Sequence, residues 1–317
     1  MSAQRRKKHH YIPKCYLKQW CGADQMLCEY QLFDGRIVPR RVHPSQTGWS
    51  ENLYAVDTLP PDLIDVVERV FFARVDQEAS DALDVLTKSR PLATPKLRSG
   101  WSRFTMSLMQ RHPGKINELW NSAKQEYRSG LEQHRSTYSA QRGFDDPESF
   151  DEFCEINYDY HVGMLFARAI QNSCDMKRVG EHLNNMYQTV FSLHEAGLKF
   201  LTSDNPLIIN TGIAHAHCRI ILPISPRQLF IFTNSEEVLD ATIRELSHGQ
   251  LFEAVNAQVV HQAYQFAYAI CENQLGWMDR HWARERPTTY AHLRPSDDHL
   301  KLEAPLPESP RAIYGLG

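Results

Sequence analysis

The chain has 317 residues, 42% of them apolar and 23% charged, with a formal net charge of -3. This is globular composition, and no segment approaches the run of about eighteen apolar residues that a membrane-spanning helix needs. The slight excess of acid argues against a protein that coats a polyanion with its whole surface. An odd number of cysteines, seven, in a chain whose opening is too polar for a signal peptide indicates a reducing cytoplasm.

The positive charge of the chain is concentrated at its start. Residues 1–19 hold six lysines and arginines and no acid. We predict that residues 1–8 form a flexible basic arm. Phosphate, in nucleic acid or in a nucleotide, is the partner that such an arm would meet.

The stretch HHYIPKCYLKQW, residues 9–20, crowds two histidines, a proline and three aromatic residues together. The proline restricts the backbone, and the aromatic side chains are expected to anchor the segment, which presents His10 where the arm joins the body. His10 either hydrogen-bonds a core carboxylate such as Glu68, or the same pair is a general base with its partner. The residues alone leave both interpretations open.

Local patterns predict the elements of the first two thirds of the chain. The Asp-Gly pair inside MLCEYQLFDGRIVPRRV predicts an N-terminal β-hairpin over residues 26–42, because glycine tolerates positive φ. Apolar residues at helical spacing then predict a run of helices. These helices are expected at residues 62–88, 95–111, 114–138, 146–172 and 177–195.

Short β-rich runs then replace the helical pattern. LKFLTSD, PLIIN, CRIILPIS and QLFIFTN predict a four-stranded antiparallel meander over residues 198–233, with its first strand ending at Asp204. A last helix is expected at 250–271, and repeated prolines make residues 286–317 a tail that does not pack. This order predicts an α+β fold, predominantly helical, in a single domain over residues 9–285.

Two acids fall where the first predicted helix should be apolar. Glu68 and Glu78 lie inside its apolar stripe, whereas Asp76 falls on the outer face with the solvated charges. A buried carboxylate is costly unless it is paired, protonated or bound to metal. We therefore predict that both glutamates are largely buried, in a salt bridge to Arg103 or Arg111, at a stripe edge that reaches water, or in a functional site. Ten residues of helix separate them by about 15 Å, too far to share one metal ion.

Polar residues also gather at two places in the predicted meander. In FLTSDNPLII, Ser203, Asp204 and Asn205 precede a proline that forces a turn. They either accept turn amides or hold an acid at a strand end that faces a pocket. His215 and His217 in AHAHC fit a loop between strands, and we predict no tight structural metal there. The sequence has no phosphate-binding glycine loop, nucleophile elbow or helical zinc motif.

Five blocks together resemble a known family. They are HHYIPKCYLKQW, SENLYAVD with the acidic helix after it, FTMSLMQRHP, FLTSDNPLII and VNAQVVHQAYQFAYA. In matching order over residues 9–271, they resemble the bacterial domain-of-unknown-function family 4238. The chain departs from the family pattern at Cys15 and Trp20, and these departures leave its polar positions intact. Those positions are His10, Glu68, Glu78, Arg111, Asp204 and Asn256.

The resemblance implies a fold neighbourhood and a set of positions, and no established reaction. Members resemble cytoplasmic bacterial proteins, and some are associated with mobile or defence loci, which favours an effector. We hypothesise an enzyme that hydrolyses or transfers a phosphate-bearing substrate, of which a nuclease-like effector in defence is one form.

The candidate residues divide by role. The catalytic candidates are His10, Glu68 and Asp204, and the substrate-binding candidates are Arg111, Ser203, Asn205 and Asn256. No residue is assigned to a metal, and the cofactor is left open. The alternatives are a nucleotide- or metabolite-binding module without chemistry, or an interaction protein whose polar core specifies the fold. We predict that His10 and Asp204 lie beside the same cleft with Glu68 or Arg111. An open cleft of this kind would favour the enzyme or the binding module.

Overall fold

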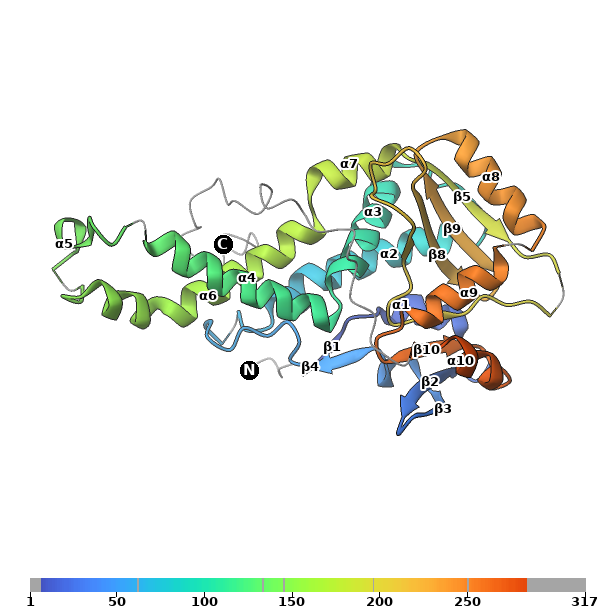
Figure 1. Ribbon diagram of the computed structural model, residues 1–317, viewed down its shortest axis with the longest axis horizontal. Coiled ribbons are helices and arrows are strands. Elements are labelled where there is room, and N and C mark those ends of the chain that lie inside the picture. The colour runs from blue at the N-terminus through green and yellow to red at the C-terminus, as the bar shows by residue number, and fades with distance from the viewer. Residues whose placement is uncertain are drawn as a thin grey trace.

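The structure is a computed structural model, which describes residues 7–61, 63–132, 134–144, 146–195, 197–249 and 251–283. An arm of long helices projects from a body in which sheets and helices pack together (Figure 1). The predicted tail, residues 286–317, and residues 1–6 of the predicted basic arm lie outside the described residues.

The described strands are all paired in antiparallel fashion. They are β1 (Lys8–His10), β2 (Leu27–Phe33), β3 (Arg36–Val42), β4 (Trp49–Glu51), β5 (Tyr187–Ser192), β6 (Thr202–Ser203), β7 (Ile208–Ile209), β8 (Arg219–Ser225), β9 (Gln228–Thr233) and β10 (Phe266–Ala269).

The described helices include two short 3-10 turns, η1 (Lys18–Trp20) and η2 (Pro44–Gln46), and one π-helical turn, η3 (Val67–Phe72). The α-helices are α1 (Lys14–Leu17), α2 (Ala73–Leu86), α3 (Pro95–Gln110), α4 (Pro113–Glu132), α5 (Tyr138–Gln141), α6 (Phe150–Cys174), α7 (Lys177–Asn185), α8 (Glu236–Ser247), α9 (Phe252–His261) and α10 (Leu275–His281).

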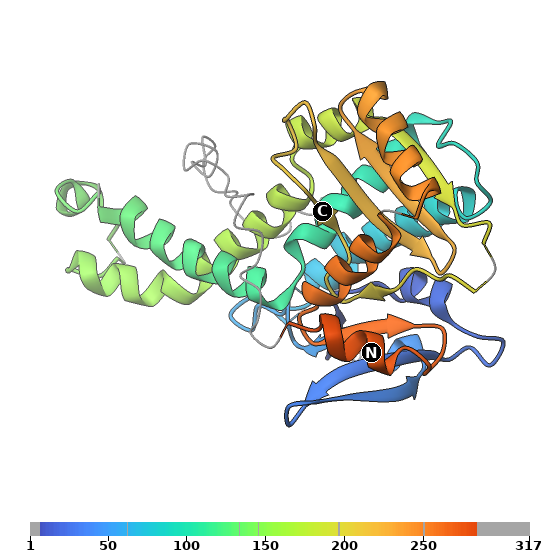
Figure 2. The same cartoon turned by 45° about the vertical axis from the view of Figure 1, so that its right-hand side comes forward.

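The strands form a two-stranded sheet, β1-β4, and two four-stranded sheets, β3-β2-β10-β6 and β5-β9-β8-β7. Helices α8 and α9 cover one face of the β5-β9-β8-β7 sheet, and α2 and α3 lie on the other face (Figure 2). The fold is α+β and predominantly helical, with the N-terminal hairpin and a four-stranded antiparallel sheet, as predicted.

The predicted hairpin is confirmed, and its turn explains why. Asp34 and Gly35 both have positive φ, 47° and 75°, which the tight turns of two-residue hairpins require. Two residues expected in the flexible basic arm are held in the fold, because the Lys7 carbonyl accepts the N–H of Asn52 at 2.8 Å and Lys8 pairs with Glu51 in the β1-β4 sheet.

Two predicted helices are wrong in part because each contains a strand. The helix expected at 177–195 ends at Asn185, and the aromatic and β-branched run after it forms β5. The helix expected at 250–271 ends at His261, and the residues after it form β10, which lies between β2 and β6. In both places the strand has a long-range partner that a local pattern does not reveal.

The predicted meander is correct for three of its four strands. β7, β8 and β9 are consecutive neighbours in one sheet, but β5 is their fourth strand. The first predicted strand became β6, which ends at Ser203 and pairs with β10 in the other sheet.

The arm consists of α4 and α6, which pack as an antiparallel pair (Figure 1). Trp120 of α4 stacks on Phe166 of α6 with ring centroids 3.9 Å apart. Gly163 lets α6 approach the segment before η3, because a Cβ there would lie 2.5 Å from Val56 Cγ1. The helix predictions at 114–138 and 146–172 therefore describe this arm, with ends displaced by a few residues.

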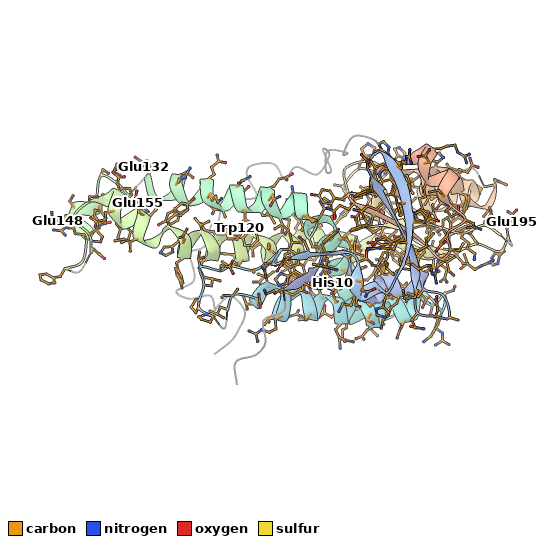
Figure 3. The ribbon with its side chains drawn as sticks, turned by 90° about the horizontal axis from the view of Figure 1, so that it is seen from below. His10, Trp120, Glu132, Glu148, Glu155 and Glu195 are labelled. Carbon is orange, nitrogen blue, oxygen red and sulfur yellow. The ribbon has the colours of Figure 1, made fainter. Side chains whose placement is uncertain are left out.

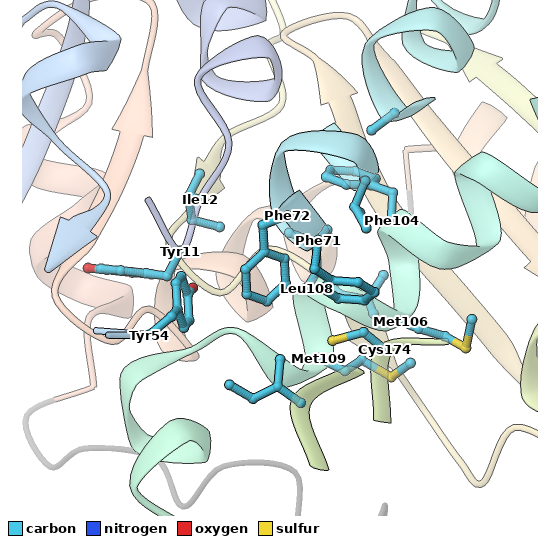
Figure 4. Packing of buried hydrophobic residues seen from close by; sticks show 14 of the residues in the cluster. Tyr11, Ile12, Tyr54, Phe71, Phe72, Phe104, Met106, Leu108, Met109 and Cys174 are labelled. Atoms are coloured by element: carbon cyan, nitrogen blue, oxygen red, sulfur yellow. The ribbon is translucent and has the colours of Figure 1, made fainter. Parts of the chain in front are cut away.

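The largest hydrophobic core joins the opening segment to the helices. Tyr11 and Ile12 pack near Tyr54, Phe71 and Phe72 in this cluster (Figure 4). The aromatic residues of the opening segment therefore anchor it to the body, as the sequence predicted. Among the residues that the structure describes, no helix is long and apolar enough to cross a membrane.

Candidate functional site

A cavity of about 740 Å³ opens beside the first strand of the chain. Its walls come from β1, α1, η2, η3 and α2. Figure 3 places His10 where the helical arm of α4 and α6 meets the body. The lining residues are Lys7, Lys8, His10, Lys14, Cys15, Ser45, Glu68, Ala73, Asp76, Gln77 and Ser80. Two catalytic candidates, His10 and Glu68, therefore share one cavity that is open to solvent.

The two adjacent histidines have different environments because successive side chains of a strand point to opposite faces. His9 is fully buried, where the Tyr54 N–H donates to its Nδ1 at 2.9 Å and the two rings stack. Its Nε2 lies 3.7 Å from Asp65 Oδ1. His9 thus holds the core, and His10 is the histidine of the cavity wall.

His10 is only 8% exposed, and its Nε2 has no hydrogen-bond partner among the described residues. Burial, with the nearby charge of Lys14, lowers the pKa of His10 to about 4, although a hydrogen bond to the backbone of Ser45 opposes that shift. The imidazole is therefore neutral at neutral pH, with a nitrogen that can accept a hydrogen bond or a proton.

Two carboxylates line the same cavity. Glu68 is half-buried in the π-helical turn η3, a distortion that is frequent at functional sites. Asp76, whose side chain is 31% exposed, was expected on the solvated outer face, and the structure corrects this. A π turn takes more residues than an α turn. A helical wheel drawn with 3.6 residues per turn throughout therefore gives wrong relative directions for side chains before and after the π turn.

Arg111 lies behind this wall and does not line the cavity. Its side chain is fully buried, with the guanidinium 4.2 Å from the centre of the Phe72 ring. Nη1 donates to Asp76 Oδ1 at 2.8 Å, and this positive charge opposes the rise in the pKa of Asp76 that burial causes. The arrangement makes Arg111 a residue that positions Asp76.

Glu78 forms a structural salt bridge, which is one of the alternatives that the sequence left open. With 20% of its side chain exposed it is largely buried, as predicted, and its carboxylate binds the guanidinium of Arg103. Arg74 Nε donates to the same carboxylate at 3.1 Å, and Arg103 Nε donates to Asp175 at 2.8 Å. Glu78 therefore joins α2 to α3, and it is not among the residues that line the cavity.

Asp204 was expected beside the same cleft as His10, but it lies in the interior and is not part of the cavity wall. Its Oδ1 accepts the N–H of Tyr264 at 2.7 Å, and its Oδ2 accepts those of Gln265 and Phe266 at 2.8 and 3.1 Å. The Tyr11 hydroxyl is a fourth donor at 3.3 Å. Burial raises the pKa of Asp204 to about 7, and these four donors oppose the rise. The carboxylate ties the end of β6 to the loop before β10.

The three remaining substrate-binding candidates are buried and hold backbone groups. Ser203 Oγ accepts the N–H of Asn205 at 3.2 Å, and Asn205 Nδ2 donates to the carbonyl of Gln262 at 2.9 Å. Asn256 accepts the N–H of Leu201 at 2.9 Å and donates to the carbonyl of Lys199 at 3.1 Å. These contacts match the turn interpretation of the motif, and none of the three lines the cavity.

The opening motif and the FLTSDNP motif nevertheless meet. Besides the contact of Tyr11 with Asp204, the Tyr16 hydroxyl lies 2.6 Å from Thr202 Oγ1, and Trp20 Nε1 donates to the carbonyl of Phe200 at 3.1 Å. The residue after His10, and not His10 itself, thus makes the link to Asp204.

The histidines of AHAHC lie on an exposed loop, with ring centroids 5.7 Å apart. His215 Nδ1 accepts the N–H of His217 at 3.1 Å, so one nitrogen shapes the turn. Within the described ranges, no three His, Cys, Asp or Glu side chains are grouped closely enough to hold a metal ion.

Comparison with known proteins gives a family. No curated protein and no solved structure matches the chain. One family model, described as "Protein of unknown function (DUF4238)", matches residues 8–270. This match spans most of the 317 residues and agrees with the resemblance seen in the five sequence blocks. The chain belongs to the DUF4238 family.

Proposed function

We propose that the cavity beside β1 binds a phosphate-bearing substrate, and that His10 acts there as the general base of a hydrolysis or transfer reaction. The observation that carries this proposal is the neutral His10, whose buried Nε2 has no partner among the described residues. A buried nitrogen without a hydrogen bond is unfavourable, so a ligand that supplies the bond is stabilised at this position.

The surroundings of His10 suit an anionic substrate. Lys7, Lys8 and Lys14 line the cavity and are exposed, although Lys8 Nζ already lies 4.3 Å from the centre of the Trp49 ring. The ammonium groups of Lys7 and Lys14 are therefore the ones that we assign to phosphate oxygens. Negative charge brought next to His10 raises its pKa again, which improves it as a base when substrate is bound. Glu68 and Asp76, the latter held by Arg111, line the same cavity and are the carboxylates that the site offers.

In the proposed reaction, His10 accepts one proton and later returns it. His10 Nε2 takes a proton from water, or from an acceptor hydroxyl in a transfer reaction. The oxygen of that nucleophile bonds to phosphorus as the bond to the leaving oxygen breaks, and the imidazolium then protonates the leaving oxygen. Asp204 takes no part in these steps: we assign it to positioning Tyr11, and through Tyr11 the strand that carries His10.

A nucleotide or nucleic acid is the phosphate compound that we favour, because the lysines of the cavity wall continue the basic opening of the chain. A role as a nuclease-like effector in bacterial defence, in the cytoplasm, remains part of this proposal and rests on the family resemblance.

One observation favours the alternative, a binding module without chemistry. General bases work best with a pKa near the working pH, and a pKa of about 4 makes His10 a weak base in the free protein. A permanently neutral imidazole would still accept a hydrogen bond from a nucleotide or metabolite. The two functions differ in whether a bound substrate is turned over.

The test compares His10→Ala with His215→Ala, a histidine on an exposed loop away from the cavity. Single-stranded RNA, duplex DNA and ATP are incubated with each protein, and cleavage and binding are measured separately. For the enzyme, we expect His10→Ala to lower turnover by about 100-fold or more and His215→Ala to leave it unchanged. Binding that depends on His10, without turnover by the parent protein, selects the binding module. If the parent protein neither turns over nor binds any of the three, both functions are wrong.

A further inference from the structure

A second surface lies along the edge of the β5-β9-β8-β7 sheet, on the side of the body away from α4 and α6 (Figure 1). Strand β5 pairs with β9 on one side, and among the described residues no backbone hydrogen bond reaches its other side. The backbone of this strand therefore ends the sheet with an open edge.

The register identifies the backbone groups at this edge. The N–H of Leu193 donates to the carbonyl of Arg227 at 2.8 Å, in line with the register of the strand pair. Hydrogen-bonded and non-bonded pairs alternate in an antiparallel ladder, so Gln188, Val190 and Ser192 direct their N–H and C=O groups away from β9. These groups match the hydrogen-bonding pattern of one further extended chain.

The sequence of β5 contains none of the residues that usually prevent another strand from pairing with an open edge. Its six residues, YQTVFS, contain no charge, proline or glycine, whereas natural proteins commonly blunt open edges with lysine, proline or a bulge. An uncharged edge strand of this length is a template for strand addition.

A cavity lies on each face of the strand. One, of about 660 Å³, is lined on the α8 and α9 side by apolar residues that include Phe191, Leu246 and Phe252. The other, of about 190 Å³, lies on the α2 and α3 side and is lined in part by Leu92 and Phe230. Both are lined by Ser89, Thr189 and Val190, so they meet along the open edge.

The smaller cavity also carries positive charge. Arg90 and Arg98 line it, and Arg98 Nε donates to the carbonyl of Leu92 at 3.0 Å. Neither arginine forms a salt bridge with an acid within the part of the chain that the structure describes. An acidic side chain would complement this cavity, and an apolar one would fill the larger cavity.

We infer that β5 is a docking edge for an extended peptide segment of a partner protein, added to the sheet as a further strand. Successive side chains of a strand point to opposite faces, so the segment has apolar residues at alternate positions, which enter the larger cavity. Acidic residues between them face Arg90 and Arg98. The partner's backbone bonds to β5 supply affinity, and the two cavities supply specificity.

The probe is the fluorescein-labelled peptide Gly-Leu-Glu-Leu-Glu-Leu-Gly, with Gly-Leu-Lys-Leu-Lys-Leu-Gly as its matched control, and binding to the full chain is followed by fluorescence anisotropy. We expect the acidic peptide to bind about tenfold more tightly, because its glutamates face Arg90 and Arg98 where the control peptide places lysines of like charge. Val190→Pro deletes one outward N–H, which an edge strand tolerates, and should weaken binding of the acidic peptide by a similar factor.

Arg98→Glu is the variant that separates docking from folding. It should reverse the preference, so that the lysine peptide binds better than the acidic one, and no loss of fold produces such a reversal. The inference is overturned if the two peptides bind equally to the parent protein, if Arg98→Glu leaves the preference unchanged, or if a folded Val190→Pro binds as the parent does. A parent protein that sediments as a dimer, and a Val190→Pro variant that sediments as a monomer, would assign the edge to a second copy of this chain and also overturn it.

Discussion

The Tyr11 hydroxyl donates to Asp204 Oδ2 at 3.3 Å, which joins two residues 193 positions apart in the chain. This contact connects the strand that carries His10 to the turn where β6 ends, and both partners are buried. The opening segment and the FLTSDNP motif are therefore linked by a hydrogen bond, although only the opening segment lines the cavity.

Tyr11→Phe tests that connection. The change removes one of four donors to a buried carboxylate, so we expect the free energy of unfolding to fall by about 1–3 kcal/mol. Urea denaturation followed by circular dichroism measures this. The control is Tyr187→Phe, since Tyr187 is 46% exposed and its loss of a hydroxyl should change stability by less than about 0.5 kcal/mol. Equal effects of the two substitutions would contradict a structural role for the Tyr11–Asp204 contact.

The lowered pKa of His10 predicts a dependence of stability on pH. The folded protein holds this histidine at a pKa of about 4, below the ordinary value of 6.5, so the unfolded chain binds more protons between these values. The contribution of His10 is therefore fully present above about pH 6.5 and is lost as the pH falls toward 4. His10→Gln should flatten this part of the stability curve by about 1–3 kcal/mol, measured by urea denaturation at a series of pH values. A curve of unchanged slope in the variant would show that His10 is not buried in its neutral form.

Two arginines that bind the same carboxylate should differ in importance. Arg103 and Arg74 both contact Glu78, but their side chains are 17% and 64% exposed. Arg103→Met leaves a partly buried acid without its main partner and should lower stability by about 1–3 kcal/mol. Arg74→Met breaks an exposed pair, worth less than about 1 kcal/mol. Thermal melting of the two variants side by side compares them, and a larger loss for Arg74→Met would refute this assignment.

Two glycines of the arm should respond in opposite ways to alanine. At Gly163 the new Cβ would lie 2.5 Å from Val56 Cγ1 and 2.8 Å from Thr58 Oγ1, so we expect a loss of about 1–3 kcal/mol. At Gly130 in α4, nothing lies within 4 Å of the new Cβ. Gly130→Ala should therefore raise stability by about 0.5–1 kcal/mol, through the higher helix propensity of alanine. Urea denaturation of both variants checks the sign of each change.

Features that depend on neighbours along the chain could be predicted from the sequence. The Asp34-Gly35 turn with its two strands and the helices α3, α4 and α6 follow from turn chemistry and helical spacing. The cost of burying a carboxylate predicted that Glu78 needs a partner or a use, with Arg103 and Arg111 both left open as partners. These effects act over a few residues or one helix face, so the sequence carries their signal directly.

Which polar residues face open space depends on contacts between distant parts of the chain. β5 and β10 became strands because distant partners supplied their hydrogen bonds, and no local pattern contains that information. Asp76, in α2 after the π turn η3, lines the same cavity as His10. Asp204 was drawn instead onto three backbone amides of a loop about 60 residues away, because a buried carboxylate is stable where donors converge on it, and such convergence is a property of the folded chain alone.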